Sequence, residues 1–150
     1  MVILGRGDRV KYGFWSDDGM SDSIYMQRAI ELAHGAMGTT SPNPPVGAVV
    51  VKDGHVLGEG RTQQPGQEHA EIEALGIAGE AAKGADIFVT LEPCAHYGRT
   101  PPCADAIIKA GVARVHIAVM DPAPHTDGRG VGRLRAAGVE VLIGEGHAEA

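Results

Sequence analysis

Residues 85–120, "ADIFVTLEPCAHYGRTPPCADAIIKAGVARVHIAVM", decide the fold. The segment opens with an almost wholly apolar run, ADIFVTL, and closes with a second one, ARVHIAVM. Short continuous apolar runs are typical of strands that are covered on both faces of a sheet. Between them, CADAIIKAG has the apolar spacing of a helix. A strand, a helix and a strand in this order predict parallel strands joined by a right-handed crossover.

The flanking sequence extends this unit in both directions. Downstream, GVGRLRAAG at residues 130–138 predicts a helix, and VEVLIG at residues 139–144 predicts another strand. Upstream, VGAVVVKDGHVLGEGR at residues 46–61 consists of two β-rich runs joined by Asp53-Gly54. An Asp-Gly pair between two such runs is a strong signal for a hairpin, so we expect antiparallel strands there.

Two further helices are predicted before the first apolar strand. One begins at Ser21 or Asp22 and ends at Gly38, with Ile24, Ile30, Ala33 and Met37 at roughly helical spacing. The other covers HAEIEALGIAGEAA, residues 69–82, with Ile72, Leu75 and Ile77 facing inward. Together these elements predict an α/β fold, a three-layer α/β/α domain with a mixed five-stranded sheet.

The chain length and charge restrict the architecture and the partners. A chain of 150 residues suits one domain, which we place at residues 21–146, with a loose N-terminal arm at 1–20 and a tail at 147–150. The net charge of −6 argues against binding a nucleic-acid strand and favours a small-molecule ligand. No apolar run is long enough for a membrane span, and the apolar start stops at Gly5, so we expect a cytoplasmic protein.

The two cysteines of the chain, Cys94 and Cys103, suggest a metal centre together with His69. Cysteines in a reducing compartment more often bind metal or do chemistry than form a disulfide. One imidazole and two thiolates suit zinc, and three protein ligands leave a fourth position for water, as in catalytic sites. His69 and Cys103 open predicted helices, and Cys94 follows the carboxyl end of a strand, where sites in open α/β sheets gather. A purely structural site would need a fourth ligand, such as His96.

Glu71 lies two residues after His69 and can act on a water molecule beside the metal. A carboxylate there takes a proton from the water and returns it to a leaving group, as in the zinc nucleobase deaminases. The tripeptide His-Ala-Glu alone is weak support, because residues 147–149 repeat it with no cysteine following. Two lone cysteines are also commonly buried apolar groups. The joint pattern of His69, Glu71, Cys94 and Cys103 nevertheless favours a catalytic zinc site.

Four stretches carry a family resemblance. They are TSPNPPVGAVVV (residues 40–51), EHAEIEAL (68–75), VTLEPCAHYGRTPPCADAI (89–107) and DPAPHTDGRG (121–130). They resemble the deaminase domain of the bifunctional riboflavin-biosynthesis deaminase/reductases, a branch of the cytidine deaminase-like superfamily. The long spacing between the cysteines is specific to this branch, since tRNA adenosine deaminases and nucleotide cytosine deaminases resemble Pro-Cys-x-x-Cys at that point.

The resemblance implies a zinc-dependent hydrolase. Its reaction would remove the 2-amino group of 2,5-diamino-6-ribosylamino-4(3H)-pyrimidinone 5′-phosphate as ammonia, in riboflavin biosynthesis. The family's substrate contacts map onto Asn43, His96 and Arg99, and Arg99 offers a planar donor fork that suits a phosphate. The resemblance also implies a homodimer or a higher homo-oligomer.

Three departures from the family pattern leave the substrate open. Arg99, Ala123 and Thr62 stand where the family often has lysine, asparagine and histidine. The alternatives are a deaminase of a related aminopyrimidine, nucleoside or nucleobase, and a catalytically silent, zinc-stabilised binding domain, against which the retention of Glu71 argues. The chain stops at Ala150, where the bifunctional family continues into a reductase domain. We therefore expect a stand-alone deaminase or a cut piece of a longer chain, and the unmatched residues 1–20 favour the former.

Overall fold

A computed structural model of the chain describes residues 5–6, 8–9, 18–36, 45–62, 69–95, 102–120 and 128–144, with side chains from residue 24 onward. Among these residues, no helix combines the length and the hydropathy needed to cross a membrane. The elements are β1 (Gly5–Arg6), β2 (Asp8–Arg9), α1 (Asp18–Gly35), β3 (Gly47–Lys52), β4 (His55–Arg61), α2 (Ala70–Ala78), the 3₁₀ turn η1 (Gly79–Ala82), β5 (Asp86–Leu91), α3 (Cys103–Ala110), β6 (Arg114–Val119), α4 (Arg129–Ala136) and β7 (Glu140–Ile143).

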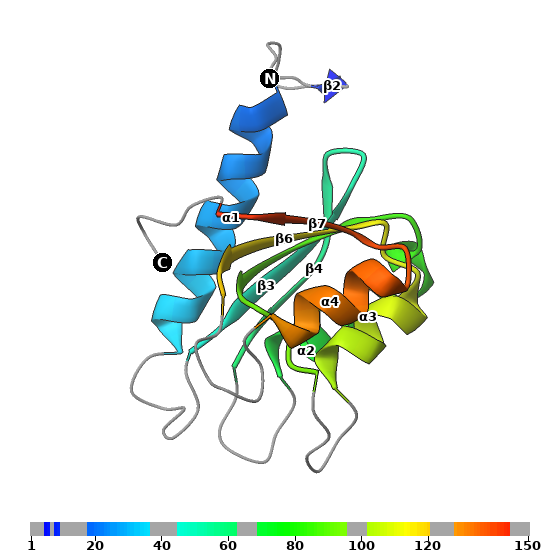
Figure 1. The fold of residues 1–150 in the computed structure, drawn as a ribbon. Helices are drawn as coiled ribbons and strands as arrows, with labels where there is room; N and C mark the ends of the chain where they lie inside the picture. The colour runs from blue at the N-terminus through cyan, green and yellow to red at the C-terminus, as the bar shows by residue number, and fades with distance from the viewer. Residues whose placement is uncertain are drawn as a thin grey trace.

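Five strands form one mixed sheet in the order β4-β3-β5-β6-β7 (Figure 1). Strand β3 pairs antiparallel with both β4 and β5, whereas β5 pairs parallel with β6, and β6 with β7. Strands β4 and β5 therefore run parallel on either side of β3, and α2 connects them as a crossover. The predicted mixed five-stranded sheet and the parallel pairing of its second half are confirmed.

The hairpin between β3 and β4 has the predicted two-residue turn. Asp53 and Gly54 have positive φ angles of 52° and 79°. Two successive residues with positive φ form a turn whose twist matches that of the flanking strands, which explains the Asp-Gly pair. The hairpin places β4 at one edge of the sheet, where it packs against α2.

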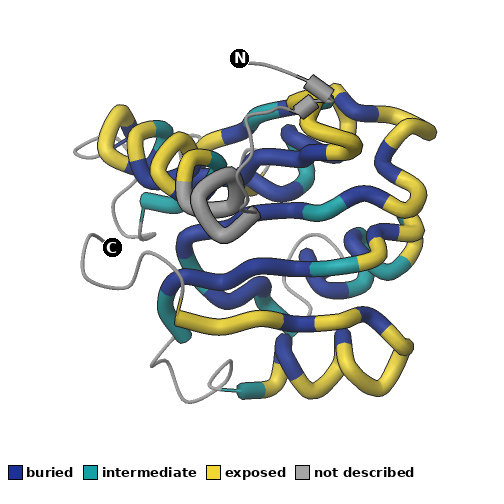
Figure 2. Tube along the Cα trace, turned by 90° about the horizontal axis from the view of Figure 1, so that it is seen from above, coloured by how far each residue is buried: buried dark blue, intermediate teal, exposed yellow. Residues whose placement is uncertain are grey.

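Helices cover both faces of the sheet, which gives the three predicted layers (Figure 1). Helix α1 lies on one face and packs with Val49, Val51 and Phe88. Helices α2, α3 and α4 lie on the other face, where Ala48 and Val50 join a larger apolar cluster. Neighbouring residues of β3 therefore point into opposite cores, as the two-residue period of a strand requires. Figure 2 shows the result, with buried strands in the middle and exposed outer surfaces on the helices.

Helix α1 differs from the prediction in its bounds. It begins at Asp18 and ends at Gly35, and Ile24, one of the four apolar residues at helical spacing, is 56% exposed. Ile30 is buried, as are Met26 and Ala29. Upstream of the helix, β1 and β2 form an antiparallel pair within the segment expected to be a loose arm.

Helix α2 packs closely on β4. A Cβ atom added to Gly58 or Gly60 would lie 2.3 or 2.2 Å from a backbone oxygen of α2. This approach leaves room only for small side chains where the backbones meet, and Ala70, Ala74 and Ala78 are buried on α2. Leu75 is buried and Ile72 partly so, but Ile77 is 63% exposed, which corrects its predicted inward position. The glycines of β4 thus determine which side of α2 faces the sheet.

Candidate metal centre and active site

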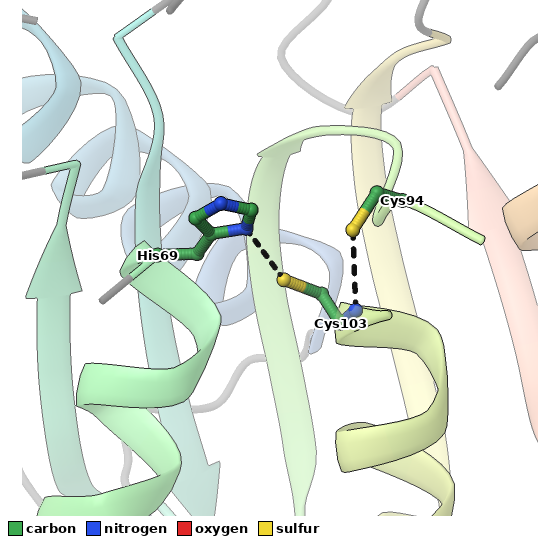
Figure 3. Close-up of side chains that lie close together, drawn as sticks. All are labelled: His69, Cys94 and Cys103. Carbon is green, nitrogen blue, oxygen red and sulfur yellow. Dashed lines mark hydrogen bonds between the residues drawn. The ribbon is translucent and has the colours of Figure 1, made fainter. Parts of the chain in front are cut away.

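Three side chains from three separate elements meet at one end of the sheet. His69 is the residue before α2, Cys94 follows β5, and Cys103 is the first residue of α3. One donor atom from each lies within 4.8 Å of the other two (Figure 3). His69 is exposed, Cys94 is half-buried and Cys103 is buried. The structure therefore brings together the three residues that the sequence singled out.

Backbone groups of α3 hold Cys94 in place. The N–H of Cys103 donates to Cys94 Sγ at 3.2 Å, and the N–H of Ala104 donates to the Cys94 carbonyl at 3.0 Å. His69 Nδ1 lies 3.0 Å from Cys103 Sγ (Figure 3). The amino end of a helix carries partial positive charge, so this position favours a thiolate on Cys94.

The two thiols differ in acidity when no cation is bound, and Cys94 is the more acidic. A hydrogen bond from the Cys103 side chain lowers the pKa of Cys94, and the same bond together with burial raises the pKa of Cys103. A hydrogen bond with Cys94 raises the pKa of His69. A cation binds thiolates, so metal binding releases the proton of Cys103.

The donor set fits zinc. At zinc bond lengths of about 2.0–2.3 Å, a tetrahedral ion separates its donors by about 3.3–3.8 Å, and the three donor atoms here lie within 4.8 Å of one another, so small side-chain movements bring them to that spacing. Imidazole and thiolate are the ligand types that zinc prefers. Within the described part of the chain, the group has three donors and no fourth, which is the ligand number of catalytic zinc sites.

Glu71 lies beside this group, on the second residue of α2. Glu71 is 5% exposed, and its carboxyl group is close enough to Cys94, Cys103 and His69 for all three to affect its pKa. Burial raises the pKa of Glu71 to about 7. A carboxyl group with a pKa near neutral pH can both accept and donate a proton, which is the property required of a general acid–base.

Glu92 is a buried carboxylate near the site that the sequence analysis did not identify. It is 3% exposed, and its two oxygens accept the N–H groups of Gly128 and Val131, each at 3.1 Å. The sequence offers one local signal, an acidic residue directly before Pro93-Cys94. Its partners lie 36 and 39 positions away, so the contact depends on the tertiary structure.

Thr62, one of the departures from the family pattern, has a bonded hydroxyl. It accepts the N–H of Val46 at 2.7 Å and donates to the Val46 carbonyl at 3.2 Å. Thr62 therefore joins the end of β4 to the start of β3. The predicted substrate contacts Asn43, His96 and Arg99, and the departure at Ala123, lie outside the described residues.

Comparison with known proteins places these residues in a family. Residues 20–119 match the cytidine and deoxycytidylate deaminase zinc-binding region. The riboflavin biosynthesis protein RibD of Escherichia coli is 57% identical over 125 residues, which are 83% of this chain and 34% of the E. coli protein. The diaminohydroxyphosphoribosylamino-pyrimidine deaminase of Buchnera aphidicola is 51% identical over 125 residues, which are 83% of this chain and 85% of the Buchnera protein.

A solved structure shows the same fold. RibD of Acinetobacter baumannii, in its second crystal form, superposes with a TM-score of 0.86 and 52% identity, over 89% of this chain and 38% of that one. The chain thus spans about a third of the length of the RibD proteins that it matches. The predicted cytidine deaminase-like fold is confirmed.

Proposed function

Because the chain belongs to the cytidine and deoxycytidylate deaminase zinc-binding family, in the branch of the riboflavin-biosynthesis deaminases, we propose that it is a zinc-dependent hydrolytic deaminase. Its substrate would be the diaminopyrimidine ribosylamine phosphate of riboflavin biosynthesis. The observation that carries the proposal is the convergence of His69, Cys94 and Cys103 beside the buried carboxyl of Glu71.

In this proposal, His69, Cys94 and Cys103 hold the zinc ion and Glu71 moves protons. A bound zinc ion supplies Lewis-acid activation of water at neutral pH. A carboxylate oxygen of Glu71 accepts a proton from the water and returns it to the amino nitrogen, which leaves as ammonia while the ring carbon gains oxygen. The burial of Glu71 keeps its pKa near neutrality and so supports both transfers.

The substrate side rests on the family resemblance. Asn43 and His96 would contact the substrate, and Arg99 would bind its phosphate with the guanidinium fork. A net charge of −6 disfavours a nucleic-acid substrate and leaves a phosphorylated small molecule as the better match. Ala123 and Thr62 depart from the family pattern, so a related aminopyrimidine, nucleoside or nucleobase is the second candidate substrate.

The test of the reaction is ammonia release by the zinc-loaded protein. The riboflavin-pathway diaminopyrimidine phosphate is compared with cytidine, deoxycytidylate, guanine and adenosine. We expect turnover of the pathway compound alone. Turnover of another compound would move the assignment to the second candidate. If one zinc ion binds per chain and no compound reacts, the chain is a zinc-stabilised binding domain.

The role of Glu71 is tested with Glu71→Gln. The amide keeps the size of the side chain but cannot accept the proton, so we expect turnover to fall by about 10²–10⁴-fold with one zinc ion still bound per chain. Glu73→Gln, the same change two residues further along α2, is the matched control and should keep most activity. Unchanged ammonia release by Glu71→Gln would refute the assigned role.

Assembly into a homodimer or a larger oligomer remains a prediction from the family resemblance. Light scattering of the purified protein measures the mass directly, and a value near the 15.6 kDa of one chain would contradict it.

A further inference from the structure

Residues 92–94, here called the ligand segment, contact the amino ends of two helices. On one side, the sulfur and the carbonyl of Cys94 accept N–H groups from the first turn of α3. On the other side, the carboxylate of Glu92 accepts the N–H of Gly128, the residue before α4, and the N–H of Val131 in the first turn of α4. The segment that carries one candidate metal ligand is thus held between α3 and α4.

The contact with α4 leaves no free space between the backbones. A Cβ atom added to Gly130 would lie 1.9 Å from the carbonyl oxygen of Pro93 and 3.2 Å from Cγ of Glu92. The first turn of α4 therefore packs directly against the ligand segment, and a shift of either one moves the other. The backbone of Glu92 is also fixed, because its N–H donates to the Val119 carbonyl of β6 at 3.0 Å.

A buried carboxylate is an unusual way to cap a helix. Helices are commonly capped by a side chain of their own N-cap residue, but α4 begins after Gly128, which has no side chain. Burial of the Glu92 charge is costly unless hydrogen bonds and the helix dipole compensate it, and here two N–H groups at the positive end of α4 do so. The capping group of α4 therefore comes from the ligand segment, two residues before Cys94.

We propose that Glu92 is a positioning residue of the metal centre, which fixes Cys94 by binding the ligand segment to the amino end of α4. The inference rests on the proposed zinc site. Glu92 touches neither the metal nor the substrate in this proposal, and it acts through the backbone of Pro93 and Cys94. Loss of its hydrogen bonds with Gly128 and Val131 would let the ligand segment move relative to Cys103 on α3.

The experiment uses the full chain loaded with Co²⁺, whose thiolate charge-transfer and ligand-field absorption reports the geometry of the sulfur ligands. Zinc affinity is measured in parallel by competition with a chromophoric chelator. In Glu92→Gln, one oxygen can still accept an N–H, but the amide nitrogen faces the other N–H and cannot accept it. We expect zinc affinity to fall about tenfold or more, with a shifted Co²⁺ spectrum, since groups that orient ligands have effects of this size.

Leu134→Ala is the matched control. Leu134 is fully buried on α4, so its truncation destabilises the helix while leaving Glu92 and the two N–H groups that donate to it intact. We expect a lower melting temperature in this variant with unchanged zinc affinity and an unchanged Co²⁺ spectrum. An equal loss of affinity in Leu134→Ala and Glu92→Gln would show that general destabilisation is the cause, and would overturn the proposal.

The outcomes separate this inference from the proposed function. If the unsubstituted protein binds no zinc in the chelator competition, and Co²⁺ gives no thiolate absorption, the proposed metal site itself is refuted. If it binds and Glu92→Gln has the same affinity and spectrum, only the positioning role is refuted. Glu92→Asp keeps the charge with a shorter reach and replaces Glu92→Gln if the latter does not fold. Its affinity should then lie below that of the unsubstituted protein, and equality would refute the role.

Discussion

Gly60→Ala tests whether the close packing of α2 on β4 holds the site together. A Cβ atom at residue 60 would lie 2.2 Å from the backbone oxygen of Ala70 and 2.9 Å from the backbone nitrogen of Ala74. Ordinary contact begins at 3.4 Å, so the helix must move by about 1.2 Å to accept one methyl group. Because the atoms in the way belong to the backbone, no rotation of a side chain relieves the clash. We expect the free energy of unfolding to fall by about 1–3 kcal/mol, as for other overpacked cores.

The same shift would reach the metal centre. Ala70 directly follows His69, so movement of the first turn of α2 displaces the imidazole relative to Cys103. A misplacement of about 1 Å can cost about 100-fold in catalysis, so ammonia release should fall much more than stability does. Urea unfolding measures the stability, and ammonia release with zinc present measures the site.

Gly76→Ala is the internal control. It also replaces a glycine with alanine, but on the solvent-facing side of α2 and not on the strand beneath it. Nothing lies within 4 Å of a Cβ atom at Gly76, which is exposed. Alanine there should raise the free energy of unfolding by about 0.5–1 kcal/mol through its helix propensity. The two substitutions must therefore differ in sign. A Gly60→Ala protein as stable and as active as the unsubstituted one would refute the packing argument.

Two further predictions concern contacts away from the metal. Thr62→Val keeps the shape of the side chain but leaves the N–H of Val46 without the hydroxyl, so urea unfolding should show a loss of about 1–2 kcal/mol with zinc content unchanged. The Arg28–Glu59 pair joins α1 to β4 with N–O distances of 2.8 and 2.9 Å, and the hydrogen bond with Arg28 lowers the pKa of Glu59. A lowered carboxyl pKa means that the pair stabilises the fold above about pH 4.3, the ordinary value for glutamate, and that this contribution is lost as the pH falls through the lowered pKa. A double-mutant cycle with Arg28→Gln and Glu59→Gln should give a coupling of about 0.5–1 kcal/mol at pH 7, and a coupling that grows on acidification would contradict the assignment.

Local patterns in the sequence were sufficient to predict the order and type of the elements. The two-residue period of the strands, the helical spacing of apolar residues and the Asp53-Gly54 turn are properties of a few neighbouring residues, so the chain displays them before it folds. The three donor residues were also recognisable, because zinc prefers imidazole and thiolate and because His69, Cys94 and Cys103 stand at the ends of predicted elements.

The inward faces of two helices were not predictable in the same way. Ile24 and Ile77 are large and apolar, yet both are exposed, whereas alanines of the same helices are buried. The reason is the surface on which each helix lies, since Gly47 under α1 and Gly60 under α2 bring the backbones into contact, and only small side chains fit at those two points. Hydrophobicity alone predicts that the isoleucines are buried before the alanines. The close approach of each helix to its strand buries the alanines and leaves these two isoleucines exposed.

The sequence alone therefore specified which side chains can do chemistry, and the tertiary structure determined how they are arranged and what surrounds them. Residue types and their local spacing fix which groups can bind a metal or move a proton, because those properties belong to the side chains. The near-neutral pKa of Glu71 arises from its burial in the fold. The role of Glu92 depends on amides 36 and 39 residues away. Desolvation and long-range hydrogen bonds exist only after the chain has folded, so no local pattern could predict them.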